Sequence, residues 1–201
     1  QIANNVNISN VTMDSCGSIY LGNVDRINVS NVTLRGCNAI FGGEAGLSNL
    51  NATNITFTSK NDTTQTNLFN SNGRWDNVVI SNINGTGEFI VNTTNLYNLT
   101  IDGGTLQNPF GLSADYVFLH ANTSAQGDFT IKGISCVQDT LTANPLQWIR
   151  PQNAVYNGTY EDCKFTETDV TNGVSNLAYC ANTTAWVNIR NTMHNAGVLR
   201  N

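Results

Sequence analysis

The residue pattern with the most evident chemistry in this chain is asparagine followed two residues later by serine or threonine. Thirteen such triplets occur in 201 residues, and each is a potential acceptor for N-glycosylation, which attaches a sugar to the side-chain amide. A chain this rich in asparagine and threonine would hold roughly eight by chance, so a purely structural role as strand and turn residues stays open. The candidate acceptors are Asn7, Asn28, Asn51, Asn61, Asn84, Asn92, Asn98, Asn122, Asn157 and Asn182.

Carboxylates and histidines, the usual acid–base catalysts, show no clustering. Cleavage of a polysaccharide needs paired carboxylates or a positioned base, whereas His120 and His194 are isolated, and we expect His120 at the surface. No cysteine or histidine spacing suggests a metal site. We therefore predict no catalytic residue, no cofactor and no metal. The acids expected to fall in different columns of the fold are Asp14, Asp25, Glu44, Glu88, Asp102, Asp128 and Glu161.

A sequence repeat predicts the secondary structure that positions these residues. NISNVT at 7–12 recurs as NVSNVT at 28–33 and NATNIT at 51–56. Each copy extends to a longer template in which alternating apolar residues flank one turn residue, and five weaker copies follow. The turn residues are Asn10, Asn31, Asn54, Asn82, Gly103, Gly133, Asp162 and Asn191.

Asparagine, glycine and aspartate tolerate the left-handed αL conformation, and period-two alternation indicates strands with one buried face. Each copy therefore predicts two short strands around a one-residue bend. A third strand is expected between copies, at 19–21, 39–41, 67–69, 89–91, 117–119, 146–148, 177–179 and 197–199. Stacking the copies places each strand parallel to its counterpart in the next copy.

The whole chain resembles the right-handed parallel β-helix, the pectate-lyase-like superfamily, in which asparagines stack at a tight turn. The resemblance implies an all-β solenoid of about eight coils. We expect one domain over 1–201, with longer loops near 58–75, 107–127 and 137–156. It implies no function, since lyases, phage tailspikes, adhesins and structural solenoids share the fold.

The two asparagines in each six-residue repeat are expected to face opposite sides of the sheet. We expect the turn column to point inward, with its amides hydrogen-bonded from rung to rung. Asn7, Asn28 and Asn51 lie between two inward residues and are expected outside. Sugar should therefore favour these three and spare the turn asparagines at 10, 31 and 54.

Two of the five cysteines share a register. Cys16 and Cys37 each lie six residues after a turn asparagine, so they should stack on adjacent rungs within disulfide range. The alternative is a stack of small buried hydrophobes. Cys136 and Cys163 are offset diagonally, and Cys180 has no partner by register.

Composition excludes several classes of function. A net charge of −5 and a pI near 4.7 argue against a nucleic-acid partner, which demands a basic face. The sequence contains no run of 18 apolar residues, so it predicts no membrane-spanning segment. With 40% hydrophobic and only 11% charged residues, the chain is expected to be folded and β-rich.

Surface features leave binding alternatives open. Trp75 and Trp148 are candidates for stacking on sugars, although Trp148 is equally expected in the core. A file of outward residues is typical of ice-binding solenoids, although threonine is simply a good exposed strand residue. That file comprises Thr12, Thr33, Thr56, Asn84, Thr105 and Ser135.

The repeat runs from Val6 to Leu199 with no capping segment that we identify. An uncapped solenoid presents a strand edge that invites pairing. We therefore expect a non-enzymatic extracellular or cell-surface structural protein, N-glycosylated, that self-associates head to tail. The runner-up is a tailspike-like receptor- or polysaccharide-binding module of a virus. A polysaccharide lyase or hydrolase and an ice-binding protein are lesser alternatives.

Overall fold

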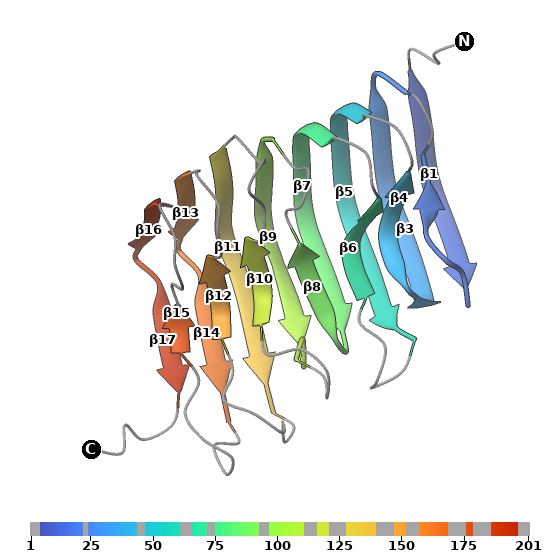
Figure 1. The fold of residues 1–201 in the computed structure, drawn as a ribbon. Coiled ribbons are helices and arrows are strands. Elements are labelled where there is room, and N and C mark those ends of the chain that lie inside the picture. Colours follow the sequence, from blue (N-terminus) through green and yellow to red (C-terminus); the bar gives the residue numbers. More distant parts are fainter. Residues whose placement is uncertain are drawn as a thin grey trace.

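The chain forms two parallel sheets that face each other across one apolar core (Figure 1). Successive coils lie side by side in chain order, so the first and last strands stand at opposite ends. This arrangement is a parallel β-helix. The computed structural model describes residues 5–21, 24–43, 47–60, 66–71, 75–92, 97–110, 116–120, 128–139, 147–151, 157–168, 176–178 and 186–196.

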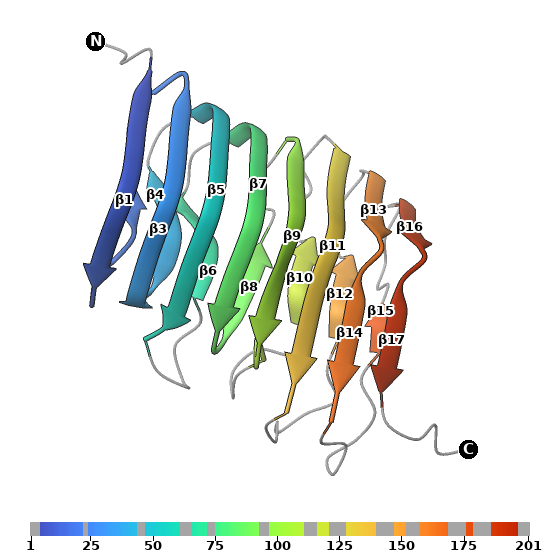
Figure 2. The same ribbon diagram turned by 180° about the vertical axis from the view of Figure 1, so that it is seen from behind.

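One long strand from each coil builds the larger sheet (Figure 2). Its strands are β1 (Val6–Asp14), β3 (Ile27–Cys37), β5 (Leu47–Ser59), β7 (Trp75–Thr86), β9 (Leu99–Gln107), β11 (Asp128–Gln138), β13 (Asn157–Glu161), β14 (Lys164–Glu167), β16 (Trp186–Arg190) and β17 (Met193–Ala196). The smaller sheet contains β2 (Ile19–Tyr20), β4 (Ala39–Gly43), β6 (Thr66–Ser71), β8 (Phe89–Asn92), β10 (Tyr116–His120), β12 (Gln147–Pro151) and β15 (Asn176–Ala178).

The register of the larger sheet confirms the predicted repeat. Val6 pairs with Ile27, Ile27 with Leu50, and Leu50 with Val78. Beyond the first rung these residues are almost fully buried. Apolar residues at alternate positions thus form columns along the axis, and each coil buries its apolar face against its neighbours.

The smaller sheet confirms seven of the eight predicted third strands, from β2 to β15. The eighth, expected at 197–199, lies outside the described residues. The longer loops expected near 58–75, 107–127 and 137–156 each contain one strand of this sheet, β6, β10 or β12. Parts of all three loops lie outside the described residues.

The predicted bends are present, but most do not interrupt the strand. All eight turn residues have positive φ, from 45° at Asn191 to 76° at Gly103. In β1, β3, β5, β7, β9 and β11 the strand continues through the bend, where two short strands were expected. Pairing resumes at once: Ser9 pairs with Ser30, and the next pair is Val11 with Val32. Only the last two rungs split, into β13 with β14 and β16 with β17.

The turn asparagines form the expected ladder but on the opposite side of the sheet. Nδ2 of Asn31 donates to Oδ1 of Asn10 at 3.2 Å, Asn54 to Asn31 at 2.9 Å, and Asn82 to Asn54 at 2.9 Å. All four side chains are exposed, so the prediction of an inward column is wrong. The αL residue breaks the alternation and turns its side chain outward beside the preceding one. The inward series then restarts at the next residue.

The core is rich in aromatic contacts. Trp75 and Trp148, considered above as sugar-stacking residues, are 1% and 0% exposed. Trp75 packs on Phe69 with ring centroids 4.5 Å apart, and Trp148 on Phe110 at 4.6 Å. Because a large aromatic ring contributes more by burial than any other side chain, these residues stabilise the space between the two sheets. Neither tryptophan is accessible to a ligand.

The cysteine register is confirmed. Cys16 and Cys37 form a disulfide with Cα atoms 4.9 Å apart, linking the first two coils. Cys136 and Cys163 are free thiols in the core, as the diagonal offset predicts. Cys180 lies outside the described residues.

The ladder gives a first prediction. Replacing Asn54 with glycine keeps the αL bend and removes the hydrogen bonds to Asn31 and Asn82. We expect this change to lower the free energy of unfolding by about 1 kcal/mol, because exposed amide bonds contribute modestly. Asn54→Ala should cost about 1 kcal/mol more, since alanine is strained at φ 55°. Denaturant unfolding of both variants measures the difference; a tolerated alanine would contradict the strain at this bend.

Candidate functional site

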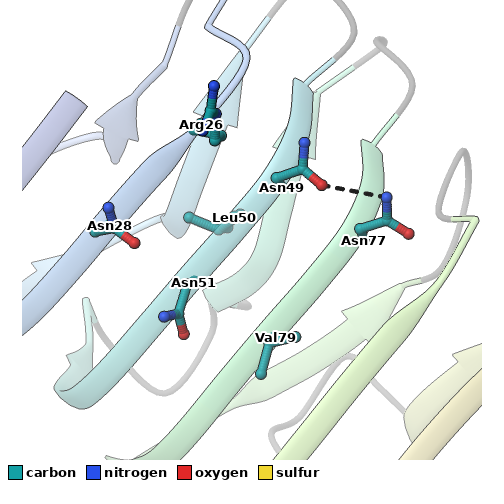
Figure 3. Close-up of a pocket in the computed structure, with 7 residues that line it drawn as sticks. All are labelled: Arg26, Asn28, Asn49, Leu50, Asn51, Asn77 and Val79. Atoms are coloured by element: carbon teal, nitrogen blue, oxygen red, sulfur yellow. Dashed lines mark hydrogen bonds between the residues drawn. The ribbon is translucent and has the colours of Figure 1, made fainter. Parts of the chain in front are cut away.

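A shallow groove of about 430 Å³ lies on the outer face of the larger sheet, over β3, β5 and β7 (Figure 3). Two columns of side chains line it, one at the start of these strands and one two residues later. We call it the amide groove, and its residues are Arg26, Asn28, Asn49, Leu50, Asn51, Asn77 and Val79.

The first column contains a second asparagine ladder, which sequence reasoning missed. Nδ2 of Asn77 donates to Oδ1 of Asn49 at 3.3 Å, and Asn98 donates to Asn77 at 3.0 Å. Asn49 and Asn77 are αL residues with φ of 59° and 52°. The signal that could have revealed them is an asparagine five residues before the turn positions 54 and 82.

The second column changes from polar to apolar side chains within the groove. Asn28 pairs with Asn51, and Asn51 pairs with Val79. Nδ2 of Asn28 donates to Oδ1 of Asn7 at 2.9 Å, whereas Asn51 makes no hydrogen bond with the described part of the chain. Val79 is apolar although it points outward, and it is 40% exposed. The groove therefore places an unengaged amide beside an exposed apolar side chain.

Arg26 supplies the only described positive charge among the groove residues. Its Nε lies 3.7 Å from a carboxylate oxygen of Asp25, and both side chains are largely exposed. Such an exposed pair is weak, and it leaves most of the guanidinium donors facing solvent. The groove can thus offer amide donors and acceptors, one cation and one apolar contact to a polar molecule.

The candidate acceptors whose side chains are described lie along the outer face of the larger sheet. Asn7, Asn28, Asn51 and Asn98 are exposed and Asn84 is half-buried. Asn92 and Asn157 lie in β8 and β13, and nothing is described of their side chains. Asn61, Asn122 and Asn182 lie outside the described residues.

The reason given for sparing the turn asparagines is wrong, because Asn10, Asn31 and Asn54 are exposed. The amides of Asn31 and Asn54 differ from that of Asn51 in another way. Nδ2 of Asn31 and of Asn54 is engaged in the ladder. Nδ2 of Asn84 and Asn98 likewise donates to neighbouring amides.

The acids are less dispersed than predicted. Asp102 and Glu161 lie in one outward column, on either side of Lys132, and Arg190 follows. The prediction overlooked that each residue immediately precedes a turn position. Lys132 bonds to Asp102 at 2.8 Å, and this hydrogen bond raises the pKa of the lysine. Positive and negative side chains therefore alternate along this column, and Lys132 is bonded to Asp102.

Buried titratable groups lie in the core of the later coils. Burial raises the pKa of the Cys136 and Cys163 thiols and of the Tyr160 phenol. Because the thiolate is the reactive form, these groups behave as packing residues at neutral pH. Within the described residues no group of three or more His, Cys, Asp or Glu could hold a metal ion. His120 belongs to β10, but its side chain is not described.

The predicted file of outward hydroxyls keeps its register from rung to rung. Its members alternate between exposed and half-buried from one rung to the next. The file consists of Thr12, Thr33, Thr56, Asn84, Thr105 and Ser135.

Taken together, the two amide ladders, the groove and the stacked coils define a parallel β-helix with a polar, amide-rich outer face. Comparison with known proteins found no matching family model, no matching curated protein and no matching solved structure. In the part of the chain that is described, no helix is long and apolar enough to cross a bilayer.

Proposed function

We propose that this chain is a non-enzymatic extracellular structural protein, N-glycosylated, whose copies stack head to tail into a filament or surface appendage. The observation that carries the proposal is the incomplete burial of apolar residues in the end rungs. Val6 and Ile8 in β1 are only half-buried, whereas their partners Ile27 and Val29 are 0% and 1% exposed. Ile189 in β16 is 39% exposed.

The two end rungs match in the pattern of their side chains. When Asn191 is aligned with Asn10, Val187 falls opposite Val6 and Ile189 opposite Ile8. Stacking β16 of one copy on β1 of the next would continue two apolar columns and the parallel pairing. Burial of apolar area is the dominant favourable term in such association, and unlike ends produce an open filament.

The proposal is tested by deleting residues 1–13 from the full chain and comparing both proteins by sedimentation and electron microscopy. We expect the full chain to form filaments and the deletion variant to remain monomeric with its middle coils folded. Filaments of unchanged length from the deletion variant would overturn the head-to-tail arrangement. A full chain that stays monomeric at high concentration would indicate that these rungs stack on a further coil of a longer protein.

Assembly should also depend on pH. His194 lies in an inward column beside Phe165, and desolvation lowers its pKa. Burial therefore favours the neutral imidazole, and stacking on the next copy would desolvate it further. Filaments should be most stable above the ordinary histidine pKa near 6.5 and weaken as the pH falls below it. Turbidity from pH 8 to pH 5 measures this, and His194→Gln should flatten the profile; an unchanged profile would exclude His194 as the cause.

The amide groove favours a second candidate function, a receptor- or polysaccharide-binding module of the tailspike type. Amide side chains and an arginine are suited to hydrogen-bonding hydroxyl groups, and the groove runs across three successive rungs. Glycan-array binding by chain made without sugars, lost in Arg26→Ala, would support this candidate. Binding that survives this change would place the carbohydrate contact elsewhere.

A further inference from the structure

We propose that the amide groove is the seat of the protein's own N-linked glycan, attached to Asn51. This inference rests on the proposed extracellular, glycosylated function and names the site and the surface that receives the sugar. Asn51 lies inside the groove, between Asn28 on the preceding rung and Val79 on the following one (Figure 3).

Asn51 is the candidate glycosylation acceptor in the groove whose side-chain amide makes no hydrogen bond with the described residues. Its side chain is exposed. Asn28, the other acceptor in the groove, uses its Nδ2 to bond Asn7. Thr53, the hydroxyl residue of the Asn51 triplet, lies two positions along β5 and so faces the same side of the sheet.

The groove offers contacts that fit the first sugar of such a glycan. Val79 gives an apolar platform for the C–H face of a pyranose ring, which accounts for an exposed valine in an otherwise polar column. Asn49 and Asn77 also line the groove, and each amide oxygen has a second lone pair to offer a hydroxyl. The guanidinium of Arg26 can donate to an acetamido carbonyl of an N-acetylhexosamine.

The covalent step is the ordinary transfer of an oligosaccharide from a lipid pyrophosphate donor. A bond forms between Nδ2 of Asn51 and C1 of the first sugar, while the C1–O bond to the pyrophosphate breaks. The lipid pyrophosphate leaves with the bonding electrons, and one Nδ2 proton passes to a base of the transferase. The remaining N–H stays available as a donor.

Spacing limits how many acceptors can be filled on this face. Asn28 and Asn51 are direct neighbours on adjacent rungs, about 4.8 Å apart. A pyranose seated over Val79 leaves no comparable platform for a second sugar on Asn28. Each molecule should therefore carry sugar on Asn51 and leave Asn28 bare.

Site occupancy is the first test. The full chain is secreted from a eukaryotic cell and analysed by glycopeptide mass spectrometry, together with Thr53→Ala, which destroys the triplet, and Thr53→Ser, which keeps it. We expect sugar on Asn51 in the parent and in Thr53→Ser and its loss in Thr53→Ala. Sugar at other acceptors but not at Asn51 would overturn this inference alone. A secreted chain without sugar at any acceptor would also overturn the glycoprotein part of the proposed function.

Whether the sugar packs in the amide groove is tested separately from whether Asn51 carries a sugar. Glycans are trimmed to a single sugar, and Tm is compared between the trimmed parent and Thr53→Ala. A seated sugar should raise Tm by about 2–4 °C. Val79→Ser should abolish this difference, while Thr100→Ser, the next residue of the same column, should preserve it. Equal Tm with and without the sugar, or an increase that survives Val79→Ser, would overturn the seat even if Asn51 is occupied.

Discussion

Gly104→Ala is expected to destabilise the solenoid by about 3 kcal/mol or more. Gly104 occupies an inward position of β9, paired with Ile83 on one side and Ile134 on the other. A Cβ added there would clash directly with the carbonyl oxygen of Ile83 and lie 2.8 Å from its backbone nitrogen. Backbone atoms of a paired strand cannot move aside as a flexible side chain can.

The backbone conformation adds to this cost. Gly104 has φ of 133°, a value that side-chain-bearing residues rarely adopt. The neighbouring Gly103 is the matched control, since its φ is 76° and a Cβ there meets nothing within 4 Å. Gly103→Ala should lose only about 1 kcal/mol from αL strain. Denaturant unfolding followed by circular dichroism gives both values, and equal losses would show that the close approach to Ile83 is unimportant.

Removing the disulfide between Cys16 and Cys37 should cost about 3 kcal/mol, the chain-entropy value for a loop of this size. The bond spans 21 residues and ties the first coil, whose inward side chains in β1 are half-buried, to β3, whose inward side chains are buried. The double change Cys16→Ala with Cys37→Ala is compared with the parent by denaturant unfolding. Fraying of the first coil, detected by hydrogen exchange in β1, should accompany the loss.

Reduction provides the control for this disulfide. A reducing agent should destabilise the parent by the same amount as the double substitution and leave the double variant unchanged. The variant keeps Cys136 and Cys163, which are buried free thiols, so a general effect of the reagent on thiols would appear in both proteins. A stability loss in the reduced variant would contradict the assignment of the effect to this bond.

Local pattern was sufficient to predict most of the fold. Alternation of apolar residues and the αL-tolerant residue types located the eight predicted turn positions and the pairing of Val6, Ile27 and Leu50. The same rule misplaced the turn side chains, because strict alternation assigns Asn10 to the inside. An αL residue resets the alternation, and that three-dimensional effect is invisible in a period-two count.

The candidate site was predictable only in part. Asn7, Asn28 and Asn51 were correctly expected outside, since their neighbours alternate regularly. The groove itself depends on which amides pair across rungs that are 21 to 28 residues apart in the sequence. The spacing of Asn49 and Asn77 from the predicted turns at 54 and 82 was visible in the sequence, but the hydrogen bond between their amides is known only from the structure.

The asparagine ladders give the solenoid a direction as well as strength. In the bonds from Asn31 to Asn10 and from Asn82 to Asn54, the amide nitrogen always belongs to the later rung. Each ladder is thus a row of aligned dipoles, with a hydrogen-bond donor at its leading end and an acceptor at its trailing end. Two leading ends brought together would oppose Asn10 donors to Asn10 donors. A polymer in which copies of this chain stack head to tail would therefore be polar, with chemically distinct ends.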